Sequence, residues 1–193
     1  MEFESLKENI YHRFGYSSVI YKPPIFSVLP KCYVNSGPDG IKVSHVRRDE
    51  YAMDFIAPVE APIYPPAVGK IVLIEQHYDK ASHSPGDGDK VNQIIVRTSR
   101  FEQYELKHIQ ARSCRFKVGD LITESDLDKE LARVGLNGYY VEDGGVEFPP
   151  HLHFAVHGTL VTSNGFKEIP LRVRFDKFNI KYGIEGSVEF SKK

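Results

Sequence analysis

The chain has 193 residues, of which 41% are hydrophobic, so it is most simply one domain with a sizeable core. Its formal net charge of -1 predicts no nucleic-acid and no anionic-membrane partner. No apolar run reaches the length of a transmembrane helix. Cys32 and Cys114 lie far apart and lack the close spacing of a thiolate zinc site. Any metal site must therefore consist of His, Asp and Glu.

The elements expected along the chain are mainly strands, because Tyr, Phe, Val and Ile are frequent and Gly and Pro interrupt the chain often. Residues 1–7 are acidic and mixed, so we expect no secretory signal there. Hairpin signals favour antiparallel pairing, and one short helix is expected at 126–134. The expected strands are 51–56, 69–75, 91–98, 101–109, 116–122, 150–154, 169–175 and 186–190.

Two histidines stand one residue apart in the expected strand at 150–154. Because side chains alternate along a strand, His151 and His153 point to one face, whereas Leu152 and Phe154 point to the other. The sequence therefore predicts a pair of imidazoles on one face of this strand and a contact with the core on the other.

Three further residues could complete a metal site. Asp54 has apolar neighbours in the strand at 51–56, where a carboxylate is costly unless it is paired or binds a metal. His45 precedes this strand, and His108 ends the second strand of the hairpin. A catalytic zinc needs three protein ligands and an open position, and His with a carboxylate is a common set.

Six segments in this order resemble those of the lysostaphin/LytM-type zinc metalloendopeptidases, which have the duplicated hybrid motif fold. The resemblance covers roughly residues 44–178. The segments are Tyr51-Ala52-Met53-Asp54-Phe55-Ile56, Ala61-Pro62-Ile63-Tyr64 with Gly69-Lys70-Ile71, Lys107-His108-Ile109, Phe116-Lys117-Val118-Gly119-Asp120, Val134-Gly135-Leu136-Asn137-Gly138 and Pro150-His151-Leu152-His153-Phe154. The resemblance implies an antiparallel β-sandwich or open-barrel sheet in a domain at 44–193, with residues 1–43 as an extension packing on or over the groove.

The resemblance also implies roles for individual residues. Asp54 and His153 correspond to ligands of a Zn²⁺ ion, and a histidine upstream of Asp54 completes the set. His151 and His108 correspond to unliganded histidines that act on the water and on the tetrahedral intermediate. Which of these two is the base, and which mainly stabilises the oxyanion, stays open.

The first zinc ligand is where this chain departs from the family pattern. Family members carry a histidine four residues before the aspartate, and Glu50 occupies that place here. We expect His45, nine residues before Asp54, to be the ligand, with Glu50 as the second choice. The literal His-x-x-x-Asp spacing of His45 and Asp49 is not the expected pair, because Asp49 lacks the apolar strand context of Asp54.

The function expected from the resemblance is hydrolysis of peptide bonds, with peptidoglycan cross-links as the substrate. Such a substrate suggests the cell envelope or secretion, although the sequence shows neither a signal nor a cell-wall-binding domain. Two alternatives stay open. One is a binding or regulatory module on the same fold with an impaired site, which Glu50 favours. The other is an unrelated β-rich binding protein or metal-site enzyme.

Overall fold

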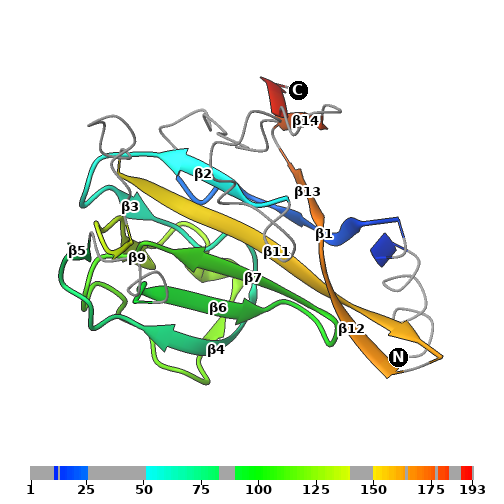
Figure 1. The fold of residues 1–193 in the computed structure, drawn as a ribbon, viewed down its shortest axis with the longest axis horizontal. Helices are drawn as coiled ribbons and strands as arrows, with labels where there is room; N and C mark the ends of the chain where they lie inside the picture. Colours follow the sequence, from blue (N-terminus) through cyan, green and yellow to red (C-terminus); the bar gives the residue numbers. More distant parts are fainter. Residues whose placement is uncertain are drawn as a thin grey trace.

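The computed structural model of the chain describes residues 11–12, 14–25, 51–82, 90–139, 150–163, 165–176, 178–182 and 188–192. Strands dominate these residues, so the predicted mainly β class is confirmed (Figure 1). The strands are β1 (Tyr16–Tyr21), β2 (Met53–Ile56), β3 (Pro62–Ile63), β4 (Gly69–Glu75), β5 (Ala81–Ser82), β6 (Gln93–Arg97), β7 (Glu102–Lys107), β8 (Leu121–Ile122), β9 (Ala132–Arg133), β10 (Gly138–Tyr139), β11 (His151–Thr162), β12 (Gly165–Pro170), β13 (Arg172–Phe175), β14 (Phe178–Tyr182) and β15 (Val188–Lys192).

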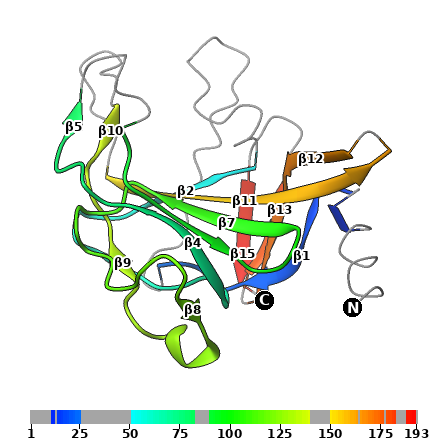
Figure 2. The ribbon, with the colours of Figure 1, turned by 90° about the horizontal axis from the view of Figure 1, so that it is seen from below.

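A seven-stranded antiparallel sheet forms the centre of the fold, in the order β12-β11-β7-β6-β4-β8 with β2 also beside β11. The long strand β11 pairs with β2 at its start and with β12 at its end, and its middle pairs with β7 on the opposite edge. Figure 2 shows this sheet nearly edge-on, with β5 and β10 on one side and β9 on the other. The first residues of β11 therefore lie where β2, β11 and β7 meet.

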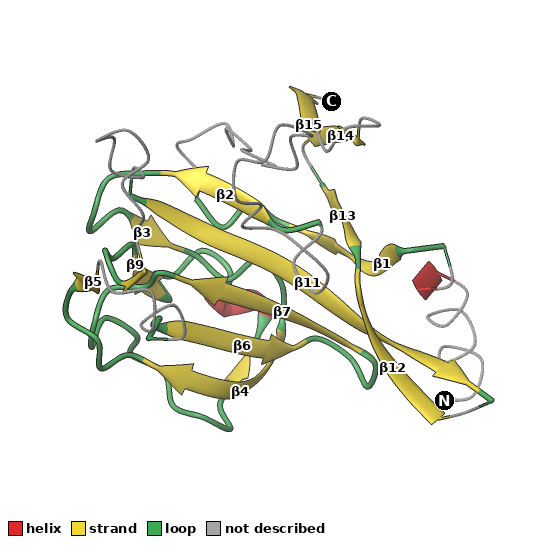
Figure 3. Cartoon of the chain, in the orientation of Figure 1, coloured by secondary structure: helices red, strands yellow, loops and turns green. Residues whose placement is uncertain are grey.

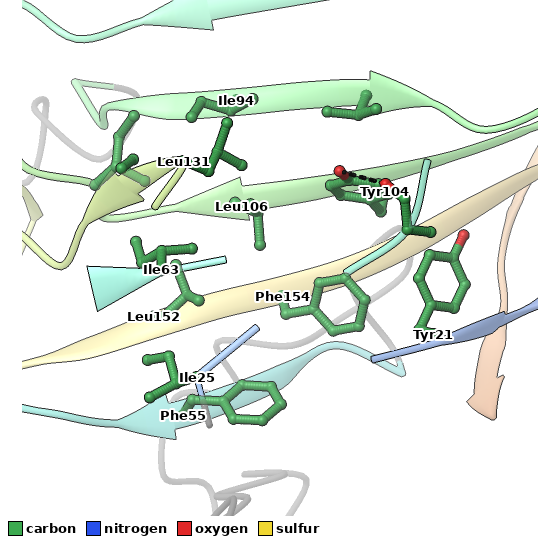
Figure 4. Packing of buried hydrophobic residues seen from close by; sticks show 14 of the residues in the cluster. Tyr21, Ile25, Phe55, Ile63, Ile94, Tyr104, Leu106, Leu131, Leu152 and Phe154 are labelled. Carbon is green, nitrogen blue, oxygen red and sulfur yellow. Dashed lines mark hydrogen bonds between the residues drawn. The ribbon is translucent and has the colours of Figure 1, made fainter. Parts of the chain in front are cut away.

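The main core lies on one face of this sheet (Figure 4). Leu152 and Phe154 of β11 are completely buried in it, as the alternation of side chains predicted. The ring of Phe154 packs edge-to-face against Tyr21 and Phe55, with centroids 5.7 Å and 6.3 Å apart. Since the apolar side chains of β11 fill this face, His151 and His153 must point to the opposite face.

Part of the predicted N-terminal extension lies on the core side of the sheet. Strand β1 pairs in parallel with β13, and Tyr21 and Ile25 are buried in the main core. The buried carboxylate of Glu102, at the start of β7, accepts hydrogen bonds from His12 and from the Tyr21 hydroxyl, at 3.1 Å and 2.8 Å. Residues 26–43 lie outside the described residues, so the division of the chain at residue 43 stays a prediction.

The predicted helix at 126–134 is wrong. This segment follows a short 3₁₀ helix, η3 (Glu124–Asp126), and ends in strand β9, which pairs with β3 (Figure 3). The Asp126 carboxylate accepts hydrogen bonds from the backbone N–H and hydroxyl of Thr123, at 2.9 Å and 2.6 Å, and this closes the turn. Leu127 and Leu131 are both buried. A turn followed by an extended segment therefore buries both leucines without a helix.

Other predicted elements differ mainly in length. Strand β4 and the β6–β7 hairpin lie where the sequence predicted them. Of the predicted strand at 116–122, only β8 pairs in the sheet, because the residues before it form a turn in which the N–H of Asp120 donates to the Lys117 carbonyl at 3.1 Å. The predicted strand at 169–175 is divided at Leu171 between β12 and β13. No helix among the described residues is long and apolar enough to cross a membrane.

Candidate metal centre

Asp54 and His153 face each other across two paired strands. They are directly opposite in the antiparallel register of β2 and β11, and opposite residues project on the same side of a sheet. Both residues are almost completely buried, with 2% and 5% of their surface exposed. Asp54 Oδ1 lies 3.1 Å from His153 Nδ1. The two predicted metal ligands therefore meet at one point on the face opposite the core.

His151 lies on the same face, one strand repeat before His153. It pairs with Ile56 in the register of β2 and β11, which makes it a diagonal neighbour of Asp54. Its Nε2 atom lies 3.9 Å from Asp54 Oδ1, and the residue is 5% exposed. The alternation of side chains along a strand thus places both imidazoles of the His-x-His motif beside one buried carboxylate.

His108 enters the same site from a third strand. It directly follows β7, whose last residue, Lys107, is opposite His153 in the sheet. The ring of His108 lies 4.5 Å from the ring of His151 and 6.4 Å from that of His153, measured between centroids. Its φ of +63° is in the left-handed region, which turns the chain out of the strand. Three imidazoles and one carboxylate therefore converge from β2, β7 and β11.

The environment of His108 defines its protonation. Burial lowers the pKa of His108 to about 3, with further lowering by His151 and His153, so the ring is neutral at neutral pH. Its Nδ1 lies 2.8 Å from the carbonyl oxygen of Asn137. A carbonyl can only accept a hydrogen bond, so Nδ1 carries the proton and donates it. The other ring nitrogen, Nε2, therefore keeps its lone pair and can accept a proton.

Gly138 leaves room for the His108 ring. Its φ is +95°, and a Cβ atom there would lie 3.3 Å from His108 Cε1 and 3.7 Å from Val91 Cβ. We expect Gly138→Ala to lower the free energy of unfolding by about 1–3 kcal/mol, because the left-handed backbone is strained for alanine and the ring must move. Urea unfolding and the imidazole resonances of His108 in an NMR spectrum measure the two effects.

The matched control for this substitution is Gly119→Ala. Gly119 has a similar φ of +99°, but a Cβ atom there would meet nothing within 4 Å. This variant should show the cost of backbone strain alone and leave the His108 resonances unchanged. Equal loss of stability in the two variants, with His108 unaffected in both, would show that Gly138 does not support the ring.

The remaining predicted ligands lie outside the described residues. His45 and Glu50 are both in the stretch 26–50, so the identity of the first ligand stays a prediction. Within the described part of the chain, no three His, Cys, Asp or Glu side chains are arranged to hold a metal ion. The described site therefore contains one close pair of candidate ligands, Asp54 and His153, with His151 and His108 beside it.

Other histidines of the chain have different partners. The buried His157 shares the face of His153, but its Nε2 lies 3.2 Å from the carboxylate of Glu105. His12 binds Glu102, and the exposed His77 packs its ring 4.0 Å from that of Tyr78. In these contacts, none of these three histidines touches Asp54, His108, His151 or His153.

Sequence reasoning missed two polar residues that support the site, Asn92 and Asn137. Both are buried, and both make hydrogen bonds close to His108. Asn137 belongs to a loop segment that resembled the family pattern, but nothing in the sequence alone links Asn92 to the site. Its contacts depend on the spatial proximity of segments that lie far apart in the chain.

Comparison with known proteins supports the fold. No protein-family model matches the sequence, and no curated protein matches it significantly. The structure is similar to the M23 metalloprotease pseudoalterin from the deep sea, with 14% identity, a TM-score of 0.52, and 91% of this chain and 92% of that chain covered. This similarity extends over nearly the whole of both chains.

Two further solved structures are more distant. A zinc-containing peptidase from Vibrio cholerae has 21% identity and a TM-score of 0.43, with 77% of this chain covered. The chain spans only 36% of the length of that peptidase. The catalytic domain of the prophage-encoded M23 protein EnpA from Enterococcus faecalis, as a mutant, has 14% identity and a TM-score of 0.42, with 64% of this chain and 75% of that chain covered. The match to pseudoalterin shows that this chain has the fold of an M23 metallopeptidase, as its resemblance to the lysostaphin/LytM family implied.

Proposed function

We propose that the protein is a zinc-dependent endopeptidase that hydrolyses peptide bonds, with the cross-links of peptidoglycan as its substrate. The observation that carries this proposal is the meeting of Asp54 and His153 at 3.1 Å, with two more imidazoles beside them. A buried carboxylate and three imidazoles, of which those of His151 and His153 are buried, are the groups that metal-assisted hydrolysis requires.

The distance between two of the predicted ligands supports a zinc ion. Nitrogen and carboxylate ligands bind zinc at roughly 2 Å, so two ligand atoms of a tetrahedral site stand roughly 3.3 Å apart. Asp54 Oδ1 and His153 Nδ1, at 3.1 Å, are close to that separation. We propose that these two residues hold the ion together with His45, and that Glu50 is the alternative third ligand.

The roles of the other two histidines follow from their protonation and position. When bound, zinc supplies a Lewis acid that polarises a peptide carbonyl. The neutral ring of His108, with its proton on Nδ1, can take a proton from water on Nε2 and return it to the leaving amine. The ring of His151 lies 4.5 Å from that of His108, measured between centroids, and its Nε2 lies 3.9 Å from Asp54 Oδ1. It can serve the same purpose or donate to the developing oxyanion.

The substrate class rests on the sequence resemblance to lysostaphin/LytM-type enzymes. The peptidoglycan cross-links that such enzymes cleave often contain glycine or D-alanine at the cleaved bond. The face that carries the site is also polar beyond the four residues: Lys107 is opposite His153, and its ammonium lies 2.9 Å from the carboxylate of Glu105. Polar groups beside the site suit a peptide with many amide and charged groups.

A second function is favoured by Glu50, which stands where the family pattern has its first histidine ligand. With a carboxylate in that place, the chain would act as a binding or regulatory module on the same fold, with zinc held weakly or not used for catalysis. This alternative keeps the contacts of Asp54 and His153 but predicts no cleavage.

The test is cleavage of muropeptides and oligoglycine peptides, followed by mass spectrometry of the new termini, together with the zinc content of the protein. We expect His151→Ala to lower kcat about 10²–10⁴-fold, because it removes an imidazole from proton transfer or oxyanion stabilisation. The control is His77→Ala, which removes an exposed histidine away from the site. Tight zinc binding with no cleavage by the native protein would favour the binding module, and equal activity of the two variants would remove His151 from the mechanism.

A further inference from the structure

Two buried asparagines lie behind His108. Asn92, just before β6, is completely buried, and Asn137, just before β10, is 1% exposed. A buried amide is stable only when its donors and acceptors are paired, so the partners of these two side chains show what each one holds in place.

Asn137 contacts both the ring of His108 and the residue after it. Its backbone carbonyl accepts the hydrogen bond from His108 Nδ1 at 2.8 Å. Its side-chain Nδ2 donates to the carbonyl of Ile109 at 2.7 Å, and its Oδ1 accepts from the backbone N–H of Asn92 at 2.8 Å. One residue thus ties the orientation of the imidazole to the backbone next to it.

Asn92 connects this arrangement to the rest of the fold without contacting the imidazole through these bonds. Its Oδ1 accepts from the backbone N–H of Tyr78 at 2.9 Å. Its Nδ2 donates to the carbonyls of Tyr78 and Ile109, at 2.8 Å and 3.1 Å. Both asparagine amides therefore converge on the Ile109 carbonyl and hold the chain directly after His108.

The backbone at His108 needs such support. Its φ of +63° is a conformation that is strained for a residue with a Cβ and persists only where the surroundings impose it. The N–H of Gly135 donates to the His108 carbonyl at 2.7 Å, which also fixes the peptide between His108 and Ile109. The strained residue is therefore held from both sides by buried polar contacts.

We propose that Asn92 and Asn137 are positioning residues that hold His108 in the tautomer with the proton on Nδ1. This orientation leaves the lone pair of Nε2 for proton transfer in the site. The inference rests on the proposed function for its effect on catalysis, but the tautomer itself is a property of the protein without metal or substrate.

The test replaces Asn92, because its side chain bonds to Tyr78 and Ile109 and acts on His108 only through the Ile109 backbone. The bond from its backbone N–H to Asn137 is kept in the variant. In Asn92→Ala, we expect a two-dimensional proton–nitrogen spectrum of the imidazoles in metal-free protein to show both tautomers of His108, whereas the native protein shows the Nδ1-protonated form. In the zinc-loaded protein, we expect kcat to fall about 10–100-fold with an unchanged KM, as for other partners that orient site residues.

Two further variants keep this test decisive. Ser17→Ala removes another completely buried polar group, whose hydroxyl donates to the carbonyl of Val19 at 2.8 Å and also binds Glu102. It should lower stability but leave the tautomer and kcat unchanged. If Asn92→Ala does not fold, Asn92→Ser, which keeps one hydroxyl donor, is measured in the same way.

The proposal is overturned if folded Asn92 variants keep the native tautomer, if native His108 carries its proton on Nε2, or if the tautomer changes while kcat does not. Failure of the proposed function looks different. In that case the native protein cleaves none of the peptides, while the spectra of metal-free protein still report whether Asn92 controls His108.

Discussion

Replacing Asp54 by alanine should remove zinc from the protein. We expect about one zinc ion per chain in the native protein and almost none in Asp54→Ala, because the variant keeps His153 but loses the carboxylate 3.1 Å from its Nδ1. A ligand that binds only the folded state at about a hundred times its Kd stabilises it by about 2.7 kcal/mol. That zinc-dependent rise in thermal stability should vanish in the variant, as differential scanning calorimetry with and without added zinc would show.

Asp79→Ala is the matched control for this substitution. Asp79 is an exposed aspartate that pairs with Arg112, with 2.8 Å between the closest charged atoms. Its removal changes the charge of the protein by the same amount but leaves the site intact. Zinc content and zinc-dependent stabilisation should therefore equal those of the native protein. Full zinc content in Asp54→Ala would show that the metal, if bound, lies elsewhere.

The largest effect on folding is expected from Glu102→Ala. The buried carboxylate accepts hydrogen bonds from His12, from the N–H and hydroxyl of Ser18, and from the Tyr21 hydroxyl, and also binds Ser17. Its removal leaves these buried and partly buried donors without their acceptor, so we expect the free energy of unfolding to fall by about 3–5 kcal/mol. Urea unfolding followed by circular dichroism measures this loss.

The control for Glu102→Ala is Glu130→Ala, which removes a partly exposed glutamate paired with Arg133. A pair of that kind contributes less than about 1 kcal/mol. Equal stability of the two variants would contradict the role of Glu102 as the anchor of residues 12–21. Deletion of residues 1–25 should destabilise the fold further, since it also removes Tyr21 and Ile25 from the core.

Acid should weaken the same anchor. Burial by itself raises the pKa of the Glu102 carboxyl, but hydrogen bonds from His12, Ser17 and Ser18 outweigh it, so the pKa lies below its ordinary value. A carboxyl with a lower pKa in the folded state than in the unfolded state stabilises the fold above the unfolded-state pKa. This contribution is lost as the pH falls through the folded-state pKa, and it should be absent from the acid unfolding of Glu102→Ala.

Local patterns in the sequence predicted the parts of the site that depend on a single strand. Alternation placed His151 and His153 on one face and Leu152 and Phe154 in the core. The apolar neighbours of Asp54 indicated a buried carboxylate, and it is 2% exposed. Such features follow from strand geometry, which acts over a few residues.

Features that depend on distant segments could not be predicted in this way. The register that sets Asp54 opposite His153 joins strands about a hundred residues apart, and Asn92 reaches His108 only through Asn137 and Ile109. The buried carboxylate of Glu102 likewise depends on hydrogen-bond donors from N-terminal residues that lie more than eighty positions away in the chain. The residue types alone made Asp54, His108 and His153 candidates for one metal site, and only the family resemblance assigned their separate roles.

The rate of peptide cleavage with and without zinc tests the central claim most directly. The protein is assayed on muropeptides and oligoglycine peptides as purified, after removal of metal by a chelator, and after zinc is added back. We predict cleavage that is lost on chelation and restored by about one equivalent of zinc per chain. Cleavage that persists without metal, or a protein that binds zinc and cleaves none of these peptides, would contradict the assignment.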